Sequence, residues 1–185
     1  MSAIHKTMDT AVGRDVALVC AANAIVGASF GAISVSGGLP LWVPVVMSLA
    51  VFAGGAQFAA VGIVLAGGGP AAGVLAGLVL NLRLLAYGFA VRDLVQGAWW
   101  KRLLGAHLTM DEAVAFALRQ TDPVRRRAAF WLCGIALFVS WNVAVALGGW
   151  AGEAIGDPGA LGLDAAFPAV LLALVLPALR DRRTR

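Results

Sequence analysis

Charged residues are scarce in this sequence, and their scarcity excludes most soluble architectures. Only 13% of the 185 residues are charged, and 61% are apolar. A soluble domain has about a quarter charged and about half apolar residues. The mean hydropathy is +0.87, and the apolar residues form long blocks. The sequence therefore predicts an all-α polytopic membrane helical bundle.

The sequence also lacks the motifs of several catalytic and cofactor-binding classes. It has no Gly-x-x-x-x-Gly-Lys phosphate loop, so this chain cannot itself hydrolyse nucleotides. Neither a paired nucleophile and base nor a cluster of metal ligands is evident. Cys20 and Cys133 share no motif and indicate neither a disulfide framework nor a metal site. We therefore expect a protein that is not an enzyme and needs no cofactor or metal.

Basic residues account for the net charge of +4, and they cluster at the ends of apolar blocks. This placement orients membrane proteins by the positive-inside rule and does not indicate nucleic-acid binding. The strongest cytoplasmic signal is the arginine-rich segment 119–127. No removable signal peptide is evident at the N-terminus. The expected organisation is a cytoplasmic tail at 1–15, a transmembrane helical domain at 16–179 and a basic cytoplasmic tail at 180–185.

About six apolar blocks are predicted to lie in the lipid bilayer, some of them broken or re-entrant. Alternating crossings would place both termini in the cytoplasm but would leave the basic segment 92–102 outside, against the charge rule. Either the block 71–91 or the block 103–118 then re-enters the membrane without crossing it, and the sequence leaves both possibilities open. The six blocks are 16–36, 41–66, 71–91, 103–118, 128–150 and 164–179.

Glycine and glutamine mark two special points in the first two blocks. Gly27 and Gly31 have the Gly-x-x-x-Gly spacing that lets a second helix approach closely. Gly54, Gly55 and Gln57 lie at the centre of the second block. They favour a loosened helix, which a membrane tolerates only where protein or a wet cavity covers the backbone. The alternative is close helix packing at the glycines, with Gln57 bridging two helices.

Arg83 is the only charged residue in the block 71–91. A charge at mid-bilayer costs about 2.5–3.5 kcal/mol on insertion scales, so this side chain needs an acid, a water-filled cavity or an anionic ligand. One interpretation is a structural arginine paired with an acid on a neighbouring helix. The other is an arginine that recognises an anion beside an unwound segment at Asn81. Tyr87 follows four residues later and shares the helical face of Arg83.

A second polar group lies in the block 103–118. His107 and Asp111 are four residues apart and would face the same way on a helix, as a proton relay or as a counter-charge for Arg83. The alternative is a capping box, Thr109-x-x-Glu112, in which Glu112 and its neighbour merely start a helix. In the last block, Asp164 is a further candidate for coupling or counter-charge.

Four motifs resemble those of the AzlC family, the large subunits of bacterial branched-chain amino-acid exporters. They are Phe-Ala-Gly-x-x-Gln-Phe at 52–58, Asn-Leu-Arg-x-x-x-Tyr-Gly at 81–88, Leu-Thr-Met-Asp-Glu at 108–112 and Gly-Leu-Asp-Ala-Ala-Phe-Pro at 162–168. The resemblance extends from about residue 28 to residue 181. It implies a multi-pass protein of the bacterial inner membrane and a small AzlD-type membrane subunit as partner.

The sequence departs from the family pattern at two positions. Ala56 stands where the family often has serine, and Leu84 stands where it commonly has histidine. The second departure removes one candidate proton carrier.

Together, the residues and the resemblance predict a secondary transporter that exports branched-chain or other small apolar amino acids with ion or proton coupling. Substrate class and direction come from the resemblance. Arg83 would bind the substrate carboxylate, and Asp111 or Glu112 would serve the amino group or a proton. Alternatives are a permease subunit of a nucleotide-driven transporter and a passive channel or assembly subunit. The predicted substrate-binding residues are Gly54, Gly55, Gln57, Asn81, Arg83 and Tyr87; those for coupling or counter-charge are His107, Asp111, Glu112 and Asp164.

Overall fold

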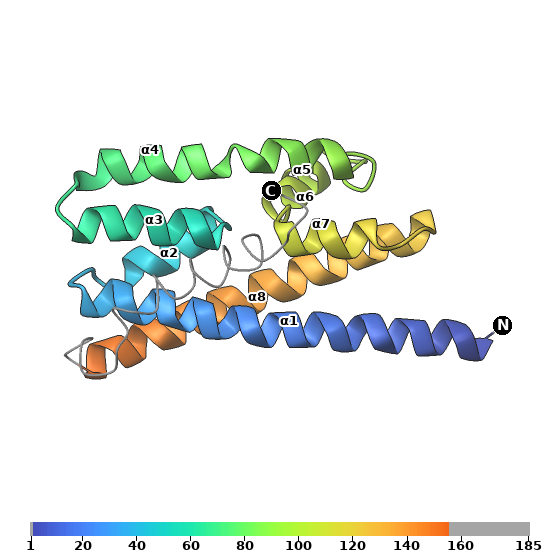
Figure 1. The fold of residues 1–185 in the computed structure, drawn as a ribbon, viewed down its shortest axis with the longest axis horizontal. Helices are drawn as coiled ribbons and strands as arrows, with labels where there is room; N and C mark the ends of the chain where they lie inside the picture. The colour runs from blue at the N-terminus through green and yellow to red at the C-terminus, as the bar shows by residue number, and fades with distance from the viewer. Residues whose placement is uncertain (1, 156–185) are drawn as a thin grey trace, which may run out of the picture.

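A computed structural model describes residues 2–155 of the chain, with side chains described from 12 to 154. Within these residues the fold is entirely helical, as predicted (Figure 1). The predicted last block, with Asp164, and the tail 180–185 lie outside the described residues. The helices are α1 (Ser2–Ser36), α2 (Trp42–Ala50), α3 (Gly54–Leu65), α4 (Gly69–Asn81), α5 (Arg83–Val91), α6 (Trp99–His107), α7 (Asp111–Leu118) and α8 (Pro123–Ile155).

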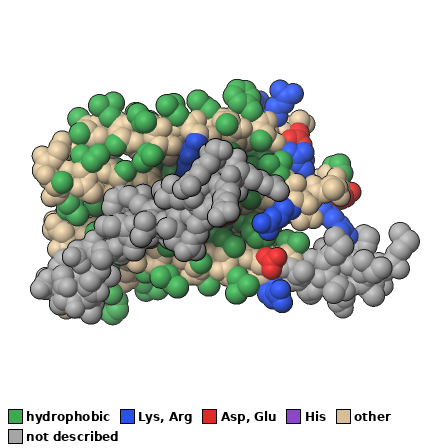
Figure 2. All heavy atoms as spheres, in the orientation of Figure 1, with side chains coloured by type: hydrophobic (Ala, Val, Ile, Leu, Met, Phe, Trp, Pro, Cys, Tyr) green, Lys and Arg blue, Asp and Glu red, His purple; other side chains and the backbone are tan. Residues whose placement is uncertain are grey.

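Three helical stretches are long and apolar enough to cross a membrane. They are Val12–Ser36, Gly69–Val91 and Pro123–Ala154; the second consists of α4 and α5, which are separated at Leu82. Large hydrophobic side chains are exposed along all three stretches (Figure 2). Exposed apolar surface of this extent suits contact with lipid. The chain is therefore a helical membrane protein.

α1 and α8 pack against each other through glycines. Gly31, in the predicted Gly-x-x-x-Gly pair with Gly27, lies directly against the backbone of Val145. Gly148 of α8 lies against the backbone of Ala28. Gly27 lies against Trp141 and Gly152 lies against Ala32, so residue numbers rise together along the two helices, which run parallel (Figure 1). The predicted close helix approach is confirmed, because a Cβ atom at either glycine would clash with the opposite backbone.

The block 41–66 forms a helical hairpin, which we call the first hairpin. α2 runs antiparallel to α8, since Leu41 lies near Gly149 and the hydroxyl of Ser48 donates to Asn142 Oδ1 at 2.6 Å. The chain turns at 51–53, and α3 then runs back toward the end of the bundle at which α2 began (Figure 1). Neither half-length helix spans the bundle, so this block is one of the broken segments that the sequence predicted.

The block 103–118 lies in a second hairpin, formed by α6 and α7 with its tip at 108–110. It enters from the opposite end of the bundle (Figure 1). The loop before it is held to α8 there, because Arg127 donates to the carbonyl of Gln96 and Arg126 pairs with Asp93 at 3.3 Å. Of the two possibilities left open by the sequence, the structure has 103–118 re-entering.

Because the two blocks form hairpins and do not cross, the basic segment 92–102 no longer conflicts with the positive-inside rule. The loop 92–98 and the turn 119–122 now lie at one end of the bundle, which we call the basic end. Charged side chains gather mainly there (Figure 2). The opposite end is formed by the connections 37–41 and 66–68, which carry no charge, and by the end of α8 with Glu153. The described residues therefore do not confirm six alternating crossings.

The described helices repeat one unit in inverted orientation. α1 is followed by the first hairpin, and the α4–α5 stretch, which runs the other way, is followed by the second hairpin (Figure 1). Inverted units whose broken helices meet inside the membrane are common in secondary transporters. The arrangement brings the two hairpin tips together at the middle of α8.

Replacing Gly148 with alanine should loosen the α1–α8 contact. The added Cβ has no room against the backbone of Ala28, and overpacking of this kind typically costs about 1–3 kcal/mol. We expect a lower unfolding midpoint in detergent. Gly62→Ala is the matched control, because a Cβ at Gly62 meets nothing within 4 Å. Equal midpoints for the two variants would contradict the packing described.

Single cysteines at Gln96, Thr121 and Ala66 test the two hairpins. In a Cys20→Ala, Cys133→Ala background, a membrane-impermeant thiol reagent should label Gln96→Cys and Thr121→Cys from the same side of the membrane. It should label Ala66→Cys from the other side. Alternating crossings predict the reverse, with Ala66→Cys on the side of Thr121→Cys and Gln96→Cys opposite.

Candidate functional site

Three helix interruptions meet near the middle of the bundle, at 51–53, at Leu82 and at 108–110. The rings of Phe52 and His107, one beside each hairpin tip, have centroids 6.3 Å apart. Both rings pack against Phe138 of α8, at 5.2 and 5.3 Å. Arg83, which follows the interruption at Leu82, pairs with Asp111 beside the second tip. We take this meeting point as the candidate site.

The first tip is closed by Gln57. Its side-chain amide donates to the carbonyl of Val51, which the break in the helix leaves without a helical donor, and accepts from Trp141 Nε1 at 3.1 Å. The Gln57 side chain is fully buried. Both interpretations of this block therefore hold in part: the helix is interrupted, and the amide bridges to α8. Gln57 offers no exposed polar atom to a ligand, so its position supports the hairpin.

The two neighbouring glycines have different surroundings. A Cβ atom at Gly54 would lie 2.9 Å from Trp141 Cη2, so this residue is a packing glycine. A Cβ atom at Gly55 would meet nothing within 4 Å, and Gly55 is exposed. Of this predicted pair, only Gly55 has free space beside it.

The second tip is closed by Thr109, which does not form the capping box of one interpretation, although the helix starts where that interpretation placed it. The Thr109 hydroxyl donates back to the carbonyl of Gly105 at 2.8 Å, at the end of α6. α7 begins at Asp111, its N-cap is Met110, and no side chain caps it. Asp111 and Glu112 therefore occupy the first helical turn, where a helix favours negative charge.

Arg83 and Asp111 form the only described ion pair at the site. Nη1 of Arg83 lies 2.5 Å from Oδ2 of Asp111. The side chains are nevertheless 49% and 39% exposed. The arginine is thus paired with an acid on a neighbouring helix, as one interpretation required, but the pair is not sealed. Both charges keep a free surface on which another polar group can bind.

The remaining predicted site residues are placed around this pair. Asn81 ends α4 two residues before Arg83, and Tyr87 is partly buried against the apolar core. His107 ends α6, so it does not share a helix with Asp111, and the prediction that their four-residue spacing places them on one helical face is wrong. The His107 ring lies edge-on to Phe138. Glu112 follows Asp111 and is partly buried.

Several residues that build the site were not predicted as site residues from the sequence. Phe52 and Phe138 form the aromatic contact between the hairpin tips, and Trp141 holds Gln57. Asn142 accepts from Ser48 and donates to the carbonyl of Phe138 at 2.8 Å. An asparagine one residue after a tryptophan in an otherwise apolar span is a signal for such a contact, although the partner cannot be inferred from it. Within the described residues, no three His, Cys, Asp or Glu side chains gather as a metal site.

Comparison with known proteins matches the chain to one family model, described as AzlC protein, over residues 19–155. The match covers well over half of the chain and includes both hairpins and all three interruptions. Among curated proteins and among solved structures, the searches found no match. The chain therefore belongs to the AzlC family, which is associated with branched-chain amino-acid transport.

Proposed function

We propose that this chain is the large subunit of a secondary transporter that exports branched-chain or other small apolar amino acids from the bacterial cytoplasm. The proposal rests on the half-exposed Arg83–Asp111 pair, which lies where three helix interruptions meet. An ionised side chain in an apolar span marks a substrate or ion pathway. Family membership supports the substrate class.

An amino acid carries one negative and one positive group, and the site has one charge to meet each. Arg83 binds the substrate carboxylate, for which a guanidinium is suited by its fork of donors. Asp111 binds the ammonium group. In the empty site the two residues neutralise each other at 2.5 Å, and the substrate replaces that pair by two new ones. Each charge at the site thus has an opposite charge beside it both in the empty and in the substrate-bound state, which limits the free-energy cost of placing charges in the membrane.

Apolar surroundings suit a branched side chain. Phe52 of the first tip and Phe138 of α8 both pack against His107 beside the second tip, and Gly55 leaves open space beside the first tip. The carbonyls and amides of interrupted helices supply further polar contacts in transporters of this general design. Asn81 and Tyr87 lie on either side of Arg83 in the chain and complete the substrate-binding set.

Coupling is assigned to the titratable residues at the second hairpin tip. His107 lies at the end of α6, and Asp111 and Glu112 begin α7. An imidazole changes charge near neutral pH. With leucine at position 84, His107 is the imidazole that remains near the site. A proton taken up here accompanies the return of the empty carrier.

The basic end faces the cytoplasm in this proposal, because basic residues mark cytoplasmic segments. The membrane is the bacterial inner membrane, and the partner is a small AzlD-type subunit. The Gly69–Val91 stretch is the least buried of the three long helices, so it has the most surface for lipid or for a second subunit. Both N- and C-terminal tails are assigned to the cytoplasm.

Arg83→Leu should abolish export, and the paired variant tests whether the loss is structural. The single change leaves Asp111 without its partner, so both stability and transport suffer. In Arg83→Leu/Asp111→Leu no unpaired charge remains, and we expect membrane levels within about twofold of wild type by immunoblot. Efflux of preloaded leucine should stay at least about tenfold reduced, since each lost charged contact is worth 1.4 kcal/mol or more. Normal efflux by the double variant would show that the pair is only structural.

His107→Phe should separate exchange from coupled transport. Phenylalanine keeps the aromatic packing on Phe138 but cannot carry a proton. In proteoliposomes with the variant, leucine counterflow should persist, whereas accumulation driven by a pH gradient should disappear. Wild type should show both activities. Gradient-driven accumulation by His107→Phe would remove His107 from the coupling mechanism.

A further inference from the structure

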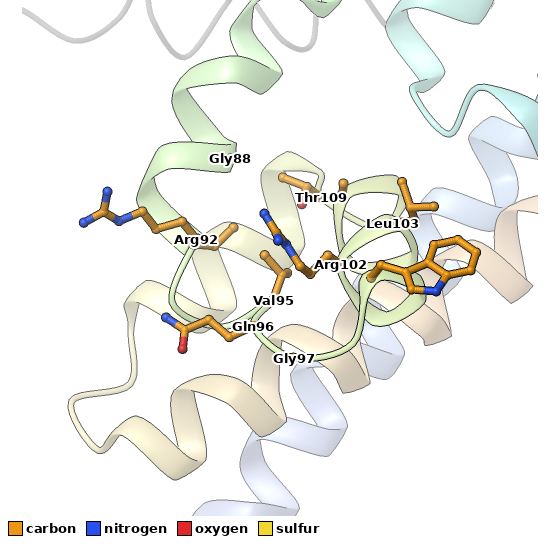
Figure 3. Close-up of a pocket in the computed structure, with 11 residues that line it drawn as sticks. Gly88, Arg92, Val95, Gln96, Gly97, Arg102, Leu103 and Thr109 are labelled. Atoms are coloured by element: carbon orange, nitrogen blue, oxygen red, sulfur yellow. The ribbon is translucent and has the colours of Figure 1, made fainter.

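A cavity at the basic end is distinct from the Arg83–Asp111 site. It has a volume of 810 Å³ and lies between the C-terminal half of α5 and α6 (Figure 3). Arg92, at the end of α5, and Arg102, on α6, line it. In Figure 3 the Arg102 side chain reaches from α6 toward α5, and Arg92 projects outward at the rim. Both arginines therefore line one opening, and the Arg92 guanidinium is directed away from it at the rim.

Neither arginine is neutralised within the described part of the chain. Neither guanidinium has an ion pair or hydrogen bond there. Asp93 pairs with Arg126 at 3.3 Å, and Asp122 Oδ2 accepts from the backbone amide of Arg125 at 2.9 Å. The start of α6 adds positive partial charge, since Trp99 lines the same cavity. The cavity thus has an uncompensated positive rim.

The cavity is apolar away from this rim. Gly88, Val91 and Leu103 line it between the two helices, and it extends to Thr109 at the second hairpin tip. Leu103 is 61% exposed and Trp99 is 73% exposed, so this side of the cavity opens along the membrane-facing surface. Tryptophan at such a position is typical of the headgroup level of a bilayer. A cationic rim above an apolar groove matches an amphipathic molecule better than a small free anion.

We propose that this cavity binds an anionic phospholipid of the cytoplasmic leaflet, with its phosphate on Arg92 and Arg102 and an acyl chain along Leu103. Basic pockets between transmembrane helices on the cytoplasmic side bind anionic headgroups in this way. A guanidinium also meets phosphate through paired hydrogen bonds. The bound lipid ties α6, and with it the second hairpin, to the end of α5.

The test uses the full chain purified in a neutral detergent. Phosphatidylglycerol should raise the unfolding midpoint, whereas phosphatidylcholine with the same acyl chains should not. Arg92→Gln/Arg102→Gln should weaken this response roughly thirtyfold in lipid concentration, since a basic residue near anionic lipid contributes about a factor of five. Lys101→Gln is the matched control, because it removes one charge beside Arg102 but does not line the cavity.

The other outcomes overturn the proposal. If phosphatidylcholine shifts the unfolding midpoint equally, the lipid merely replaces detergent. If inorganic phosphate shifts it equally, the cavity is a site for free anions. If Lys101→Gln weakens the response to phosphatidylglycerol as much as the double variant does, the attraction is non-specific. If the double variant does not fold, a second experiment on the wild type takes its place. It measures how strongly phosphatidylglycerol brominated on its acyl chains quenches the tryptophan fluorescence. Brominated phosphatidylglycerol should quench more strongly than brominated phosphatidylcholine, and Trp99→Phe should remove this difference. Equal quenching by the two lipids would overturn the proposed site.

Discussion

A membrane tolerates an interrupted helix only where the freed backbone groups find partners in the protein or in water, and this constraint organises the whole chain. At the first hairpin tip, Gln57 accepts from Trp141 and donates to the carbonyl of Val51. At the second tip, the hydroxyl of Thr109 donates to the carbonyl of Gly105. Each tip thus carries its own polar side chain to close the break. The packed glycines of α1 and α8 provide the rigid pair of helices against which both tips are held.

The same constraint explains why polar chemistry concentrates at one depth. Interruptions bring backbone polar groups and titratable side chains into an otherwise apolar protein, and the hairpin geometry places them together. Arg83 and Asp111 both belong to the second unit of the inverted arrangement, and the tip of the first unit reaches the same depth through the contact of Phe52 with His107. A site built between two units can change its access when one unit moves against the other. In the proposed cycle, the arginine exchanges a fixed carboxylate for that of the substrate.

Composition and glycine spacing predicted much of the fold, because lipid exposure and close helix approach leave direct traces in the sequence. The cost of burying charge also predicted that Arg83 needs an acid, a water-filled cavity or an anionic ligand. The first hairpin was not predicted, since two half-helices of apolar residues have the same composition as one crossing helix. The relation of His107 to Asp111 was misjudged for a similar reason: a four-residue spacing implies one helical face only if no turn intervenes. Thr109 has the sequence of a cap, but its hydroxyl bonds to the preceding helix.

The fold of the site depends on the direct proximity of the two hairpin tips. It is tested by cross-linking Phe52→Cys with His107→Cys in native membranes, in a chain from which Cys20 and Cys133 have been removed. The 6.3 Å between the two ring centroids predicts efficient bridging by a short bifunctional thiol reagent, and little bridging when Trp99→Cys replaces His107→Cys. Equal yields for the two pairs, or no bridging of the first pair while both thiols react singly, would contradict the meeting of the tips.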